Sequence, residues 1–332
     1  MVIYVILIAF TASLTALAFV AGPYTVFFTQ LSPTYNSATQ GQPYLWIGPL
    51  PLFLPFTVPA GLFFLGLVVV YALMFGLSAR QGPSPIAAIS GSVRQGFSLL
   101  FASPFLVTLI AIAFLVFTAT MADVILSATG LPVGGVQMDP FFLFISFTAA
   151  PLREELGFRV LIVGALAVVL TLGRPRREVL RALWRPSAAY GHETNAGSAK
   201  WLIVLAVVGS SVLFGVAHVV TGVGWEVGKA FEATYGGLVL GYLYVKYGLH
   251  LSVLTHWGVN YLGTVFAFFG QGAYGVPWDS SPGFVLQQAV EIDLISLFGL
   301  ASFLVVLNIG LRRLLTRGLN SSDDSEVHKA PG

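Results

Sequence analysis

The chain has 332 residues, of which 56% are hydrophobic and only 9% are charged, and its mean hydropathy is +0.86. A soluble domain of average composition is about 25% charged, so this chain has too few charges to cover a soluble protein of its size and is predicted to be a polytopic membrane protein. The net charge of +2 is too small to indicate nucleic-acid binding, and the absence of cysteine excludes disulfides, thiolate metal sites and cysteine catalysis.

Apolar runs of about 20 residues are long enough to cross a bilayer as helices. Such runs occur at residues 2–22, 52–77, 97–118, 140–172, 201–221, 231–246, 249–270 and 290–311. The predicted fold class is therefore all-α, a polytopic transmembrane helix bundle of about eight spans. The first run begins at Val2 with no basic residue before it, which favours a retained span over a cleaved signal peptide.

Two of the runs contain residues that bear on helix geometry. Pro55 and Pro59 fall within the second run, where neighbouring helices can tolerate them. The sixth run is short for a span, and Gly237 and Gly241 within it have the small-xxx-small spacing that lets two helix backbones approach closely. We expect a packing role for these two glycines.

The polar loops alternate in basic charge, which predicts the orientation of the chain. Loops 23–51, 119–139 and 271–289 contain no Lys or Arg, whereas 79–96, 173–200 and the segment after the last run are basic. By the positive-inside rule, both termini lie in the cytoplasm. Lys229, in the loop 222–230, is the exception. We expect an integral protein of the cell membrane.

Four ionisable side chains, Arg153, Glu154, Glu155 and Arg159, interrupt the apolar run 140–172. A charge at mid-bilayer costs roughly 2.5–3.5 kcal/mol on insertion scales, and such residues usually serve a function. Glu155 precedes Arg159 by four residues, the favourable orientation for an ion pair on a helix. Glu154 is turned about 100° away, so we expect one held carboxylate and one that is available for chemistry. Arg153 is expected to pair with a carboxylate or to line a cavity mouth. Alternatively, the four charged residues form a buried cluster that only fixes helix packing.

Two later runs carry further polar residues. His218 lies near the end of 201–221, and His256 and Asn260 lie four apart on one face of 249–270. At about 1.5 Å per helical residue these side chains and Glu154 lie at comparable depths, so they can meet in one cavity. This set of a glutamate, two histidines and an asparagine, with no nucleophilic Ser, Thr or Cys in an obvious role, favours water activation. A buried carboxylate can take a proton from water. One histidine would orient or protonate, and the second histidine and the asparagine would stabilise an oxyanion.

Three motifs, in chain order, are similar to those of a known family. They are EExxxR (Glu154, Glu155, Arg159), FxxxH (Phe214, His218) and HxxxN (His256, Asn260). Together they resemble the motifs of the CPBP family, named for CAAX proteases and bacteriocin-processing enzymes and also called the Abi family. Its members are intramembrane glutamic endopeptidases that include the CAAX prenyl endopeptidase. The resemblance covers about residues 140–270.

The resemblance implies a role for each motif residue. Glu154 would activate the attacking water with His218 beside it, and His256 and Asn260 would form the oxyanion hole. The other three motif residues would hold and tune the site. The implied substrate is a peptide or protein, prenylated or unmodified, cut within the lipid bilayer. No metal is implied; a zinc ion held by Glu154, His218 and His256 is the alternative, although the sequence has no HExxH motif.

Two other functions compete with proteolysis. A proton-coupled transporter could use the same Glu, His and Asn groups as a relay, but transporters often contain internal repeats and no repeat is evident here. A catalytically inactive family member acting as a scaffold is a third reading. We divide the chain into N-terminal transmembrane helices without a family resemblance (1–139), a catalytic core (140–270), a last loop and final span (271–319), and a disordered tail (320–332).

Overall fold

A computed structural model describes residues 2–37, 39–40, 44–48, 50–136, 138–190, 196–221, 224–288 and 294–310. The expected tail 320–332 lies outside the described residues. The described chain is almost entirely helical, as predicted. Four of its helices are long and apolar enough to cross a membrane: α1 (Val2–Phe28), α3 (Ala60–Arg80), α5 (Pro104–Ala128) and α9, whose apolar part is Gly197–Val220. The predicted helical membrane bundle is therefore confirmed as a fold class.

The second predicted span begins later than expected. Residues 52–59 are not helical, because α3 starts at Ala60 with Pro59 as its N-cap. Proline lacks a backbone N–H and drives the residue before it into an extended conformation. Pro59 lies in extended chain and Pro55 at a tight bend, so neither is inside a helix. The prediction that a helix tolerates the two prolines was wrong.

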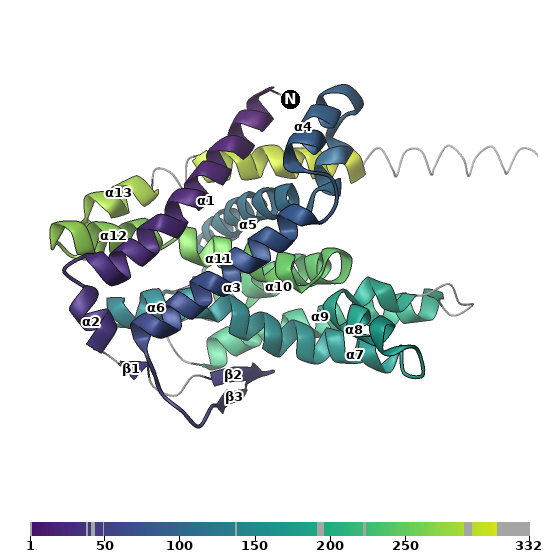
Figure 1. Cartoon of the computed structure of the whole chain (residues 1–332), viewed down its shortest axis with the longest axis horizontal. Helices are drawn as coiled ribbons and strands as arrows, with labels where there is room; N and C mark the ends of the chain where they lie inside the picture. The colour runs from purple at the N-terminus through teal and green to yellow at the C-terminus, as the bar shows by residue number, and fades with distance from the viewer. Residues whose placement is uncertain are drawn as a thin grey trace, which may run out of the picture.

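The chain before α3 forms two short antiparallel pairs instead. β2 (Tyr44–Ile47) pairs with β3 (Leu50–Phe53) as a hairpin, with Tyr44 opposite Phe53. β1 (Thr39–Gln40) pairs with β4 (Val58–Pro59). Figure 1 shows the β2–β3 hairpin on one flank of the bundle, near α6. Outward-facing Ile47, Leu50 and Leu52 are 47%, 68% and 49% exposed, so this flank stays apolar.

The fourth predicted span changes its hydrogen-bonding pattern part of the way along. α6 (Pro140–Glu154) starts after Asp139, whose carboxylate accepts a hydrogen bond from the N–H of Phe141 at 2.9 Å. A π-helix follows at Glu155–Gly164, and α7 covers Ala165–Val169. The π-helix is rare and often found at functional sites. It begins at Glu155, four residues after Pro151, which lies inside α6.

The fifth and sixth predicted spans pack together beside the seventh, which contains the most fully buried helix of the bundle. α9 (Ala196–Val220) packs along α10 (Val227–Tyr247), which is a full-length helix rather than a short one. Gly241 permits this close packing, since a Cβ there would lie 2.6 Å from a methyl group of Val207. The seventh span is divided at Gly263 and Thr264 into α11 (Leu249–Leu262) and α12 (Val265–Tyr274). Every residue of α11 from Leu249 to Gly258 is buried.

Shorter helices complete the described chain: α2 (Ser32–Ser37), α4 (Pro85–Gln95), α8 (Arg176–Trp184), α13 (Pro282–Gln288), an apolar helix at Ser296–Gly310, and 3₁₀ turns at Phe97–Ala102, Pro186–Tyr190 and Trp278–Ser280. In Figure 1, α4 and α8 lie towards one end of the bundle and α2, α12 and α13 towards the other. The basic loops 79–96 and 173–200 thus share one end. α2 and α13, which lie in the loops 23–51 and 271–289 without Lys or Arg, are at the opposite end, whereas the β2–β3 hairpin lies on a flank. The orientation of the chain in the membrane stays a prediction.

Candidate active site

Glu155 is fully buried and has three polar partners. Its Oε2 lies 3.4 Å from Nε of Arg159, which is also fully buried. The hydroxyl of Ser252 donates to the same oxygen at 2.5 Å, and Nδ1 of His256 lies 2.9 Å from Oε1. The i,i+4 ion pair predicted from the sequence is therefore present. A buried ion pair persists only with close geometry and additional hydrogen bonds, and Glu155 has both.

Phe214 connects the buried arginine to the two histidines. The guanidinium carbon of Arg159 lies 4.3 Å from the centre of the Phe214 ring, a cation–π contact. The same ring meets His218 and His256 edge-on, with centroids 4.6 and 5.9 Å apart. This contact gives the arginine a second partner inside the protein and packs Phe214 of α9 against the π-helix.

His256 lies between the two glutamates. Its Nδ1 faces Glu155, and its Nε2 lies 3.5 Å from Oε2 of Glu154. An ionised carboxylate only accepts hydrogen bonds, so Nδ1 carries the hydrogen and donates it to Glu155. Nε2 of a neutral ring would then present a lone pair to a second carboxylate. Nε2 of His256 and the carboxylate of Glu154 thus face each other directly.

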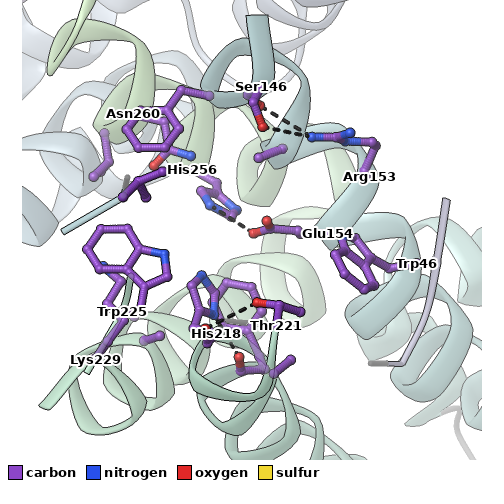
Figure 2. Close-up of a pocket in the computed structure, with 18 of the residues that line it drawn as sticks. Trp46, Ser146, Arg153, Glu154, His218, Thr221, Trp225, Lys229, His256 and Asn260 are labelled. Atoms are coloured by element: carbon purple, nitrogen blue, oxygen red, sulfur yellow. Dashed lines mark hydrogen bonds and ion pairs between the residues drawn. The ribbon is translucent and has the colours of Figure 1, made fainter. Parts of the chain in front are cut away.

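His218 presents its other nitrogen to the same space. Its Nδ1 lies 2.8 Å from the carbonyl oxygen of Phe214, which can only accept, so Nδ1 donates and Nε2 remains an acceptor in the neutral ring. Figure 2 shows Glu154, His218 and His256 turned towards one space between α6, α9 and α11. The structure therefore brings together residues that are up to 102 positions apart in the chain.

These groups line a cavity of about 690 Å³. Asn260 also lines it, one helical turn after His256, as the spacing predicted. The side chain of Glu154 is 16% exposed, whereas that of Glu155 is 0% exposed and does not reach the cavity. Of the two adjacent acids, Glu154 is thus the one that a substrate could meet.

Much of the cavity wall comes from outside α6, α9 and α11. The hairpin contributes Tyr44, Trp46, Pro51 and Phe53, α5 contributes Leu115 and Ala119, and the loops 129–139 and 221–226 contribute Val136, Met138, Thr221 and Trp225. Val136 and Met138 lie in the loop 119–139, which contains no Lys or Arg, and Lys229 is the single basic residue of the loop 222–230 that contains Trp225. The cavity is therefore on the side of the bundle away from the basic loops.

Two cations also line the cavity. Arg153 stacks on Tyr44, with its guanidinium carbon 4.2 Å from the ring centre, and its terminal nitrogen reaches the carbonyl and hydroxyl oxygens of Ser146 at 3.4 Å. It thus lines the cavity, one of the two predicted alternatives. Lys229 forms an ion pair with Glu232 at 3.1 Å.

Some residues of the site were not foreseen. Ser252 has a sequence signal, because Ser252, His256 and Asn260 are spaced by four and share one face of α11. Trp46 has none: its backbone lies directly against Gly157, where a Cβ would collide with the carbonyl oxygen and Cβ of Trp46. Nothing in the local sequence predicts that contact between distant segments.

The arrangement of the histidines and carboxylates determines whether the cavity could hold a metal ion. Among the residues that the structure describes, no group of three or more His, Asp or Glu side chains is arranged to hold a metal ion. Nδ1 of His256 is committed to Glu155, and Nδ1 of His218 to a carbonyl. Metal independence itself stays a prediction.

Comparison with known proteins gives one match. Residues 136–262 match the family described as "Type II CAAX prenyl endopeptidase Rce1-like". No curated protein and no solved structure matches the chain. The matched region runs from four residues before α6 to the end of α11, contains all seven motif residues and is consistent with the CPBP resemblance. It indicates an integral membrane protease of the CAAX type, a hydrolase acting on protein or peptide substrates.

Proposed function

We propose that this chain is an intramembrane glutamic endopeptidase, in which Glu154 activates the water that attacks the peptide bond. The observation that carries the proposal is the unequal state of the two adjacent glutamates. Glu155 is surrounded by Arg159, Ser252 and His256. Glu154 is left facing a cavity that also contains the two histidines.

The attack step assigns one task to each group. Glu154 takes a proton from water as the water oxygen bonds to the scissile carbonyl carbon, a general-base role. Nε2 of His218, held as an acceptor, orients the second water hydrogen. The developing oxyanion needs donors in a water-poor site; the amide of Asn260 supplies one, and Nε2–H of protonated His256 supplies the other.

The collapse step returns the proton. Glu154 protonates the leaving amine as the C–N bond breaks, so it acts first as base and then as acid. Glu155 holds the ring of His256 with Nε2 towards the cavity, because its carboxylate accepts the hydrogen bond from Nδ1–H. No metal takes part in this scheme.

The substrate and its access route are also part of the proposal. The cavity wall is mainly aromatic and aliphatic, which suits an apolar peptide segment or a prenylated one. Both termini lie in the cytoplasm of a cell-membrane protein, and the cavity then opens towards the outer half of the bilayer. A prenylated C-terminus and an unmodified transmembrane or secreted peptide are the two substrate classes to compare.

The decisive experiment uses purified protein in detergent with a panel of prenylated and unmodified peptides. Glu154→Gln should abolish cleavage while the protein remains folded. Glu178→Gln, which removes an exposed carboxylate of α8 far from the cavity, is the matched control and should be fully active. Wild-type activity in Glu154→Gln would show that another group is the base. Proton-coupled flux into liposomes without any cleavage by the wild-type protein would instead support a transporter.

A further inference from the structure

We propose that a second groove, at the basic end of the bundle, binds the phosphate headgroup of an anionic phospholipid. This groove has a volume of about 1160 Å³ and lies apart from the candidate active site. Five cations line it: Arg176, Arg177, Arg181, Arg185 and Lys246. No Asp or Glu is among its lining residues in the described part of the chain.

The arginines are arranged along one side of a single short helix and its end. Arg177, Arg181 and Arg185 follow each other at intervals of four residues along α8 and its C-cap. Within the described residues, none of the five lining cations has a carboxylate within 4.0 Å. The positive-inside rule accounts for basic residues on this face, but it does not require five of them to line one groove without counterions. Guanidinium groups bind phosphate oxygens in a bidentate manner.

The depth of the groove points to a lipid. α3 ends one residue before the lining residue Gln81, α5 begins at the lining residue Pro104, and α10 ends at the lining residue Tyr247. Because α3 and α5 are candidate spans, their ends mark the boundary between hydrocarbon and headgroups. Basic pockets at this level, between helices that cross the membrane, bind anionic headgroups.

The groove also has an apolar wall that a soluble anion would not need. Leu180 and Trp184 of α8 are 53% and 36% exposed beside the arginines. Exposed tryptophan and leucine next to arginine on a short helix are typical of a helix lying in the membrane interface. A phospholipid can contact both parts of the groove, because its phosphate can bind the arginines while its acyl chain packs against Leu180.

The position of α8 is fixed by the bundle, so the groove is preformed. Trp184 stacks on the buried ring of His250 in α11, with centroids 5.6 Å apart and planes at 11°. The hydroxyl of Tyr244 in α10 donates to the carbonyl of Leu183. The ligand therefore does not have to order the helix that binds it.

Native mass spectrometry of the full chain in a non-ionic detergent tests the proposal. The protein would be titrated with phosphatidylglycerol, phosphatidylcholine and glycerol phosphate. We expect retention of phosphatidylglycerol alone. At about 1 kcal/mol per arginine, Arg177→Gln/Arg181→Gln should weaken phosphatidylglycerol binding about 30-fold. The matched control is Arg80→Gln/Arg94→Gln, which removes two exposed arginines from the same end of the protein but outside the groove.

Three results would overturn the proposal. Equal weakening in the two double variants would assign binding to general surface charge. Displacement of the lipid by glycerol phosphate at a similar concentration would make this a site for soluble anions. Equal retention of phosphatidylcholine and phosphatidylglycerol would remove the role of the arginines. The substituted side chains are all exposed, and an unchanged melting temperature verifies that each variant is folded.

Discussion

Replacing Glu155 by glutamine should destabilise the protein far more than the same change at Glu154. At position 155 the change removes the charge that faces Arg159 at 3.4 Å, and both side chains are fully buried. Glutamine has a single acceptor oxygen, so it cannot accept from both Ser252 and His256. At position 154, the carboxylate lies 3.5 Å from Nε2 of His256, and the glutamate is 16% exposed.

The contacts around Glu155 narrow the expected loss of unfolding free energy. Breaking a buried ion pair from one side costs about 3–5 kcal/mol, because it leaves the other charge unpaired. Ser252 can turn its hydrogen fully to the carbonyl of Leu240 at 3.0 Å, and Arg159 keeps its contact with Phe214. We therefore expect about 3 kcal/mol for Glu155→Gln, the lower end of that range. Glu154→Gln should cost about 0–1 kcal/mol, as for a partly exposed pair.

Reversible unfolding in mixed micelles, followed by tryptophan fluorescence, would measure both free energies of unfolding. Glu178→Gln is the control and should stay within about 0.5 kcal/mol of wild type. The double variant Glu155→Gln/Arg159→Gln should be more stable than the sum of its single changes predicts, by at least about 1 kcal/mol, since neither charge is then left alone. If Glu154→Gln proves the more destabilising change, the assignment of the held and the available carboxylate is reversed.

Further outcomes are expected for the site and the topology. Asn260→Ala should lower kcat about 100–1,000-fold, the usual cost of one oxyanion donor; a change confined to KM would make Asn260 a substrate-binding residue. Activity should survive exhaustive chelation, and loss restored by added zinc would turn Glu154 and the histidines into ligands. Single cysteines at Ser187, Ser280 and Ser325 of this cysteine-free chain should react with an impermeant reagent outside intact cells only at 280; labelling at 187 or 325 would invert the topology. Gly157→Leu should displace the backbone of Trp46 and lower activity, whereas unchanged kinetics would show that the hairpin does not shape the site.

The sequence predicts those parts of the molecule that depend on local spacing. Intervals of four residues placed Glu155 beside Arg159 and Asn260 one turn from His256, and apolar run lengths predicted a helical bundle. Spacing cannot predict which distant helix supplies a partner, so the bond from His256 to Glu155 was missed. The extended chain before α3 was missed for another reason: hydropathy alone does not distinguish an apolar strand from an apolar helix.

The hairpin and α5 have a consequence for how far the matched region can stand alone. A fragment reduced to residues 136–262 would retain every motif residue, yet it would lack Tyr44, Trp46, Pro51, Phe53 and Leu115, which close the cavity around Glu154. Gly157 would then expose its backbone where Trp46 now covers it. Water would reach the acid from an additional direction. The N-terminal third of the chain, although outside the family match, therefore supplies part of the cavity wall around Glu154. Under the proposed function, exchanging it between related proteins should alter which peptides are cut.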